Sequence, residues 1–311
     1  MPDLLIRTLQ FAVPVLVTIF LGLFFAGLLA EMGALNRISR ISRPLVSLAH
    51  LPEICASSFI VSLGSTIAAN SMVARFKEEN SLGNKEVFLC TMINSIPAYI
   101  REIFTYQIPI VVPALGLFAG GLYAMVFMVT AIVKILVVIV LGRTLFEPRS
   151  YGQMALQDKK SVSLDKAVSK VLRSQRRIFL RIASVYLLMT YILFMLRERG
   201  IFESMSVLPI AGIFGIPPES IVPLTTYVAS PILGISMLGP MIRSGSVSEV
   251  QAMIVLMLGS MLMLPVFALR SMVPNYTALF GPKLGLSVVA VSTGISILVR
   301  LAFLLAFLRI A

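Results

Sequence analysis

Charge is scarce in this sequence. Only 13% of its 311 residues are charged and 58% are hydrophobic, with a mean hydropathy of +0.96. Soluble domains contain about 25% charged residues. Several apolar runs approach the roughly 20 residues that a membrane-spanning helix needs. The composition excludes an ordinary soluble domain and predicts an all-α membrane protein that crosses the bilayer several times.

Cysteine and histidine are also rare, and tryptophan is absent. The two cysteines, Cys55 and Cys90, are too few for a disulfide framework and lack metal-ligand spacing, so we expect small core residues. The sequence has no Gly-rich phosphate loop followed by Lys-Ser or Lys-Thr, no His-Glu-x-x-His and no Gly-x-Ser-x-Gly motif. We therefore expect neither an enzyme nor a bound cofactor or metal, and the sequence leaves a coupling ion open.

Acidic residues are half as common as basic ones, 14 against 26, which gives a net charge of +12. The basic residues lie mainly between apolar segments, as the positive-inside rule predicts. This placement indicates the lipid bilayer, and not nucleic acid, as the partner of these charges. We expect the cytoplasmic membrane of a prokaryote, with the basic loop 143–181 on the cytoplasmic side, and homo-oligomerisation stays open.

An internal repeat organises the chain. Adding 165 to a residue number aligns Ser65 with Ser230, Pro109 with Pro274, and Gly116 with Gly281. The repeats are predicted at 1–145 and 178–311, joined by a basic linker at 146–177. The expected spanning helices are 9–30, 87–104, 122–141, 178–196, 250–269 and 286–308.

Two segments are too polar to face lipid and too apolar for ordinary loops, "GSTIAANSMVARF" at 64–76 and "SPILGISMLGPM" at 230–241. Basic residues flank the first segment on both sides, so it should enter and leave from one face as a re-entrant hairpin over 54–84. Its counterpart is expected at about 221–248. With three spans and one hairpin, the first half crosses the membrane an odd number of times, so the second half is inserted in the opposite orientation. The connector 200–221 should then be external, and it has no Lys or Arg, as this orientation predicts. Inverted repeats with broken helices are typical of secondary transporters.

The candidate site follows from these breaks. Backbone groups at the hairpin tips, and carbonyls freed by Pro97 and Pro265, would face a cavity near the membrane midplane. Charged side chains within the membrane either form ion pairs and reach the interface or bind an anionic solute, and both readings stay open. The candidate anion or ion-pair residues are Lys134, Arg300, Arg101 and Glu102. The candidate solute-binding residues are Ser65, Thr66, Asn94, Ser95, Pro97, Ser230, Pro231 and Ser260.

At these residues the chain resembles the nucleoside-recognition, or Gate, family. That family includes the transport core of concentrative nucleoside transporters and the membrane domain of FeoB ferrous-iron permeases. "GSTIAANSMVAR" is similar to the Gly-Cys-Asn-Val-Pro-Ala segment of FeoB, and "TMINSIPAY" resembles its Met-Ser-Cys-x-x-Arg-Leu-Pro-Val-Tyr. Ser65 and Asn94 stand where FeoB has cysteines, and no GTPase domain is present. The resemblance implies a transport fold in which two hairpins and two broken helices hold the solute.

The sequence thus predicts a transporter of a small polar solute, nucleoside-like or anionic, that works by alternating access. Two alternatives remain. One is a divalent-metal permease similar to the FeoB membrane domain. The other is a membrane assembly or regulatory protein that keeps the fold without transporting.

Overall fold

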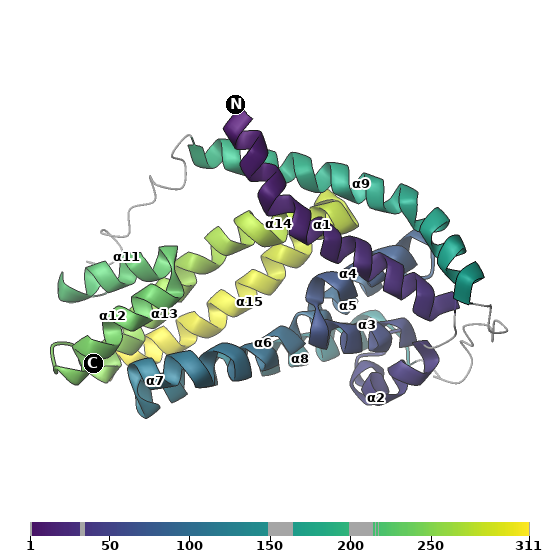
Figure 1. The fold of residues 1–311 in the computed structure, drawn as a ribbon. Helices are drawn as coiled ribbons and strands as arrows, with labels where there is room; N and C mark the ends of the chain where they lie inside the picture. Colours follow the sequence, from purple (N-terminus) through teal and green to yellow (C-terminus); the bar gives the residue numbers. More distant parts are fainter. Residues whose placement is uncertain are drawn as a thin grey trace. The chain divides into compact units, whose positions relative to one another are not determined.

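The computed structural model describes residues 2–31, 35–148, 164–198 and 218–310, together with the single positions 214 and 216. Every regular element in these ranges is a helix, which confirms the predicted all-α class (Figure 1). The elements are α1 (Pro2–Glu31), α2 (Leu35–Leu48), α3 (Glu53–Gly64), α4 (Thr66–Glu78), α5 (Asn84–Asn94), α6 (Ile96–Glu102), η1 (Ile103–Val111), α7 (Val112–Leu115), α8 (Leu117–Leu145), α9 (Leu164–Glu198), η2 (Pro218–Ser220), α11 (Ile221–Ala229), α12 (Pro231–Arg243), α13 (Glu249–Phe267), η3 (Ala268–Met272), α14 (Val273–Phe280) and α15 (Pro282–Leu308).

Five helical stretches in the described ranges are long and apolar enough to cross a membrane: Leu4–Leu21, Asn84–Ile108, Leu117–Leu145, Glu249–Phe280 and Pro282–Leu308. They overlap five of the six spans expected from the sequence, the first only over 9–21. The sixth, 178–196, lies within α9, which is not among the five. Helix α9 begins inside the predicted linker 146–177, whose residues 149–163 lie outside the described ranges.

The chain forms two compact units, and each takes segments from both halves of the sequence. Unit 1 comprises Met1–Ala98, Lys134–Met195 and Met272–Val289. Unit 2 comprises Tyr99–Val133, Leu196–Ser271 and Ala290–Ala311. The compact units therefore do not coincide with the stretches 1–145 and 178–311.

Hairpin 1, the segment α3–Ser65–α4, lies in unit 1. Ser65 has extended backbone (φ −153°, ψ 116°) between the two helices. Ser58 from the first arm and Asn70 from the second both hydrogen-bond to the side chain of Asn94. In a straight helix, twelve residues would separate Ser58 from Asn70 by about 18 Å, too far for both to reach one amide. The arms therefore fold back beside each other. Entry and exit at one face of the membrane stays a prediction.

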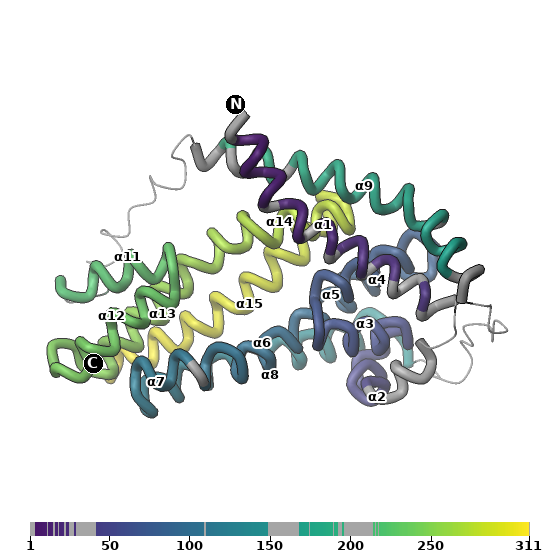
Figure 2. The backbone as a smooth tube through the Cα atoms, in the orientation of Figure 1, coloured from purple at the N-terminus to yellow at the C-terminus, as the bar shows by residue number. Residues whose placement is uncertain are grey.

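Hairpin 2, the segment α11–Ser230–α12, lies in unit 2 and has the same break, with Ser230 at φ −150° and ψ 103°. Its arms touch at Gly234. A Cβ atom there would lie 2.5 Å from Cβ and 2.6 Å from Cα of Tyr227. In a straight helix these two residues would be about 10 Å apart along the axis. The turn that brings them together can be followed in Figure 2.

The same local geometry recurs 165 residues later at further positions. Gly116 (φ 89°) and Gly281 (φ 84°) each end a short helix in a backbone conformation that favours glycine. The π-helices η1 and η3 begin at Ile103 and Ala268, and α5 and α13 begin at Asn84 and Glu249. The breaks on which the sequence repeat was based are thus matched in backbone conformation as well as in residue type.

The hairpins also make corresponding contacts with the other half of the sequence. In unit 1, Lys77 near the end of α4 donates from Nζ to the carbonyl oxygen of Phe280 at 3.0 Å. In unit 2, Arg243 at the end of α12 donates from Nη1 to the carbonyl oxygen of Ala114 at 3.2 Å. Both acceptors lie in the last turn of a short helix, where carbonyls lack helical donors. Burial lowers the pKa of the Lys77 ammonium, and neighbouring Glu78 opposes this shift.

The expected breaks at the prolines differ between the halves. The helix of the first half is interrupted at Ser95, and Pro97 lies in the first turn of α6, where a missing N–H is tolerated. In the second half, α13 continues through Gly259 and Ser260 with Pro265 inside it. The irregularity comes later, at the π-helix η3. The prediction of a helix break beside Ser260 was wrong, because Pro265 leaves the helical path of α13 intact.

Candidate functional site

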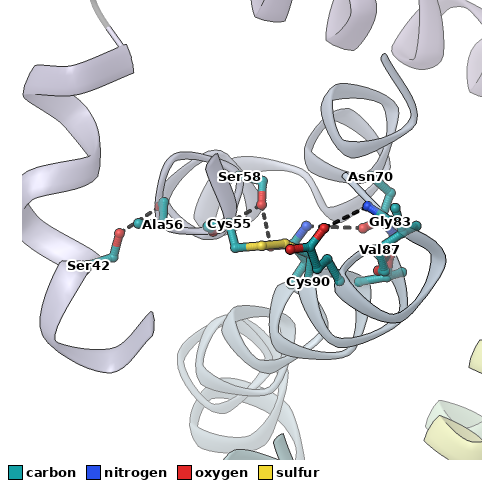
Figure 3. The surroundings of a disulfide bond; sticks show 11 residues. Ser42, Cys55, Ala56, Ser58, Asn70, Gly83, Val87 and Cys90 are labelled. Atoms are coloured by element: carbon teal, nitrogen blue, oxygen red, sulfur yellow. Dashed lines mark hydrogen bonds between the residues drawn. A yellow bond between two sulfur atoms is a disulfide. The ribbon is translucent and has the colours of Figure 1, made fainter. Parts of the chain in front are cut away.

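A buried polar cluster in unit 1 centres on Asn94, at the end of α5. Its Nδ2 donates to Oδ1 of Asn70 at 3.2 Å, and its Oδ1 accepts from the hydroxyl of Ser58 at 3.2 Å. All three side chains are buried. Figure 3 shows Ser58 and Asn70 approaching from different helices. Because the network joins both arms of hairpin 1 to α5, it fixes the hairpin in place and supplies amide and hydroxyl groups beside it.

A disulfide lies next to this cluster and joins α3 to α5 through Cys55 and Cys90 (Figure 3). Their Cα atoms are 5.3 Å apart, and both residues are fully buried. The expectation of buried residues is confirmed, but the sequence did not predict that they pair. Residues 35 positions apart meet only because hairpin 1 folds back onto α5. The bond is a second clamp on this hairpin.

The two hairpin tips differ in how their serines are used. The Ser65 hydroxyl caps α4 by accepting from the backbone N–H of Ala68 at 3.2 Å. The Ser230 side chain forms no such cap, and Pro231 occupies the first turn of α12. Beside Ser65, Thr66 Oγ1 is buried and has no hydrogen-bond partner among the described residues. The Thr66 hydroxyl is therefore the group at this tip that is left without a structural role.

These tips give a direct test of stability. Ser65→Ala should lower the free energy of unfolding by about 1 kcal/mol, because it removes the cap of α4. Ser230→Ala, at the matched position without a cap, should leave the melting temperature unchanged. Thermal unfolding of the two purified variants in detergent would check this difference. Equal losses in both would contradict the assigned cap.

A second buried cluster, in unit 2, surrounds Arg300 of α15. The side chain is 3% exposed. Its Nε donates to Ser260 Oγ at 3.1 Å, its Nη1 donates to the Ser296 carbonyl at 3.0 Å, and the guanidinium lies 5.1 Å from the ring centre of Phe127. The Ser296 hydroxyl also hydrogen-bonds to that of Tyr99 at 2.9 Å. The groups that hydrogen-bond to or stack on Arg300 are thus neutral, and none of the ion pairs in the described part of the chain involves it.

Among the described residues, the hydrogen bonds of Arg300 are with Ser260 and Ser296, and none is with another of the charged candidates. Lys134 is buried and belongs to unit 1. Arg101 and Glu102 are exposed at the end of α6. Ser95 hydrogen-bonds to the carbonyl of Met92 at 2.7 Å. Of the predicted residues, the structure brings together Arg300 and Ser260, and it places Asn94 in a separate cluster.

Several polar residues of these clusters were not predicted. They are Ser58 and Asn70 beside Asn94, and Tyr99, Tyr123, Tyr227 and Ser296 in unit 2. The hydroxyls of Tyr123 and Tyr227 bond to each other in the core. Tyrosines in apolar helices resemble ordinary core or interface residues. The sequence signal that could have found them is the presence of polar side chains in otherwise apolar helices, since a buried polar atom needs a hydrogen-bond partner. That signal does not identify the partner.

The structure is that of an all-α protein with five helical stretches that could cross a membrane and with two helical hairpins. Three proteins of Methanocaldococcus jannaschii are similar to it over nearly their whole length, and all three are described as uncharacterized. MJ0880 is 25% identical over 288 residues, 92% of this chain and 93% of its own. MJ0871 is 24% identical over 306 residues (97% and 94%), and MJ1556 is 26% identical over 300 residues (96% and 94%). No family model and no solved structure matches the chain.

Proposed function

We propose that this protein transports a small polar solute across the membrane by alternating access. The observation that carries the proposal is the single extended serine that breaks each hairpin, Ser65 and Ser230, at matched positions of the two halves. Irregular backbone at membrane depth is tolerated where it lines a cavity or is buried in protein. Broken helices in both halves are typical of solute sites in secondary transporters.

The proposed arrangement is a Gate-type inverted repeat. The contacts of Lys77 with α14 and of Arg243 with α7 support it, because each hairpin packs against the short helix of the other half. Such exchanged contacts are what a two-fold relation between repeats produces. An odd number of crossings in the first half would then insert the second half in the opposite direction, so that the hairpins open toward opposite faces.

Uptake into proteoliposomes tests this proposal. The panel consists of radiolabelled nucleosides, small carboxylates, inorganic phosphate and divalent metal ions. We expect saturable uptake of at least one polar solute that Thr66→Val greatly slows. The Thr66 hydroxyl has no partner in the described protein, so its removal should not lower the melting temperature.

Thr225→Val is the matched control, because the Thr225 hydroxyl is exposed and bonds only within its own helix. This variant should transport normally. Failure to take up any member of the panel would contradict the proposal. Uptake confined to metal ions would instead favour the metal-permease alternative.

A further inference from the structure

We propose that the Arg300 cluster binds the carboxylate group of a monocarboxylate anion, an inference that rests on the proposed transport function and names its substrate class. The starting point is the guanidinium itself. A buried, unpaired charge within a membrane protein is costly and usually faces a partner or a pathway. Arg300 is 3% exposed, and none of the ion pairs between described residues involves it.

The hydrogen bonds of Arg300 leave donors for a ligand. A guanidinium has five N–H donors, and the described residues accept from Nε and Nη1. Phe127 covers one face of the guanidinium, so a further ligand would approach in the plane of the group. In-plane pairing with two oxygens is the geometry in which arginine recognises carboxylates.

The groups around Arg300 suit an oxygen-rich ligand. The Ser260 hydroxyl and the Ser296 carbonyl accept from the guanidinium, and the Ser296 hydroxyl bonds to that of Tyr99. The centre of the Tyr123 ring lies 5.4 Å from that of Phe127, which covers the guanidinium, and Tyr106 packs against the same hydrophobic core. The Tyr106 hydroxyl is buried without a hydrogen-bond partner among the described residues. This unpartnered donor is a second, independent indication that a polar ligand completes the cluster.

The charge balance selects the class of anion. No second buried cation accompanies Arg300 within the described residues of unit 2, since the other buried cations, Arg75 and Lys134, belong to unit 1. One guanidinium neutralises one negative charge. A dianionic phosphate would leave an uncompensated buried charge, whereas a monocarboxylate would leave none.

Thermal shift of the purified, full-length protein in detergent tests the inference. The probes are propionate, lactate and benzoate, with propionamide, lactamide and benzamide as neutral isosteres, and inorganic phosphate. We expect at least one carboxylate, and not its amide, to raise the melting temperature, because a ligand stabilises the state that binds it. Arg300→Gln should weaken that binding by about 30-fold or more. Arg309→Gln removes an exposed arginine of the same unit and should change nothing.

A folding defect is separated from a binding defect by Arg300→Met. This variant leaves no orphaned partner, because Ser260 already bonds to the Met257 carbonyl and the Ser296 carbonyl lies within a helix. We expect its melting temperature without ligand to equal or exceed that of the wild type, since replacing a buried charge with a well-packed apolar group is often stabilising. The carboxylate-induced shift should be lost. A large fall in the ligand-free melting temperature would make Arg300 structural and overturn the inference.

Other outcomes also decide. If no carboxylate raises the melting temperature, or if Arg300→Gln leaves that rise unchanged, the inference is overturned. If phosphate raises the melting temperature and Arg300→Gln removes the rise, the choice of monocarboxylates is overturned. Carboxylate binding without uptake in proteoliposomes would contradict transport and leave the binding site standing. Uptake of a neutral solute that is unaffected by Arg300→Gln would support transport and contradict the carboxylate site.

Discussion

Gly285→Ala is expected to lower the free energy of unfolding by about 3 kcal/mol, near the upper end for overpacking. A Cβ atom at Gly285 would lie 2.6 Å from the backbone carbon and oxygen of Tyr276. Backbone atoms cannot move aside as a flexible side chain can, so α15 and α14 would have to separate. Gly120→Ala should have a similar effect, because its Cβ would lie 2.6 Å from the Cα atom of Val112.

Two neighbouring glycines provide controls for this prediction. Gly121 and Gly294 have no atom within 4 Å of the position where a Cβ would lie. Their replacement by alanine should leave the melting temperature unchanged or raise it slightly, because glycine is the poorer helix former. Melting curves of the four variants would check that the melting temperature falls in the first pair and stays level or rises in the second. Loss of stability in Gly120→Ala but not in Gly285→Ala would contradict the equivalence of the two positions, which lie 165 residues apart.

Asn94→Ala is expected to cost about 2–4 kcal/mol of unfolding free energy. The substitution removes the donor to Asn70 and the acceptor of Ser58, and it leaves a cavity in a fully buried position. Asn70→Ala should be similarly harmful alone. The double variant should lose less than the sum of the two, because both single changes break the same hydrogen bond.

Asn84→Ala is the matched control for this cluster, because Asn84 is exposed at the start of the same helix, α5. It should change the melting temperature little. A strictly additive double variant would show that Asn94 and Asn70 do not act as a pair. If Asn94→Ala kept full stability and lost transport, the residue would serve the solute alone and not the packing of hairpin 1.

The sequence was most informative where a structural feature depends on a short stretch of neighbouring residues. Apolar runs of sufficient length predicted the all-α class and overlap five helical stretches that are long and apolar enough to span, because lipid demands helices with internally satisfied backbones. Ser65, Ser230, Gly116 and Gly281 all lie at interruptions between helices, and the positive φ of the two glycines is a conformation that few other residues adopt. The inversion of the second half and the Gate relationship remain predictions.

The sequence was weaker wherever the outcome depends on which elements meet. Pro265 predicted a break beside Ser260 that α13 does not have, because a proline's effect depends on the packing around its helix. Cys55 and Cys90 were expected to be separate core residues, and the fold of hairpin 1 onto α5 brings their Cα atoms to 5.3 Å.

By itself, then, the sequence indicated the all-α class, the helical stretches long and apolar enough to span a membrane, and the breaks at Ser65 and Ser230, all of which depend on neighbours along the chain. Only the tertiary structure decided that Arg300 meets Ser260 and Phe127, and that Asn94 joins Ser58 to Asn70. A buried polar atom must find a partner, but its choice depends on distances between helices that are far apart in sequence. For that reason the sequence indicated Asn94, Ser260 and Arg300 as candidates, but it indicated neither their other polar partners nor the grouping into two clusters.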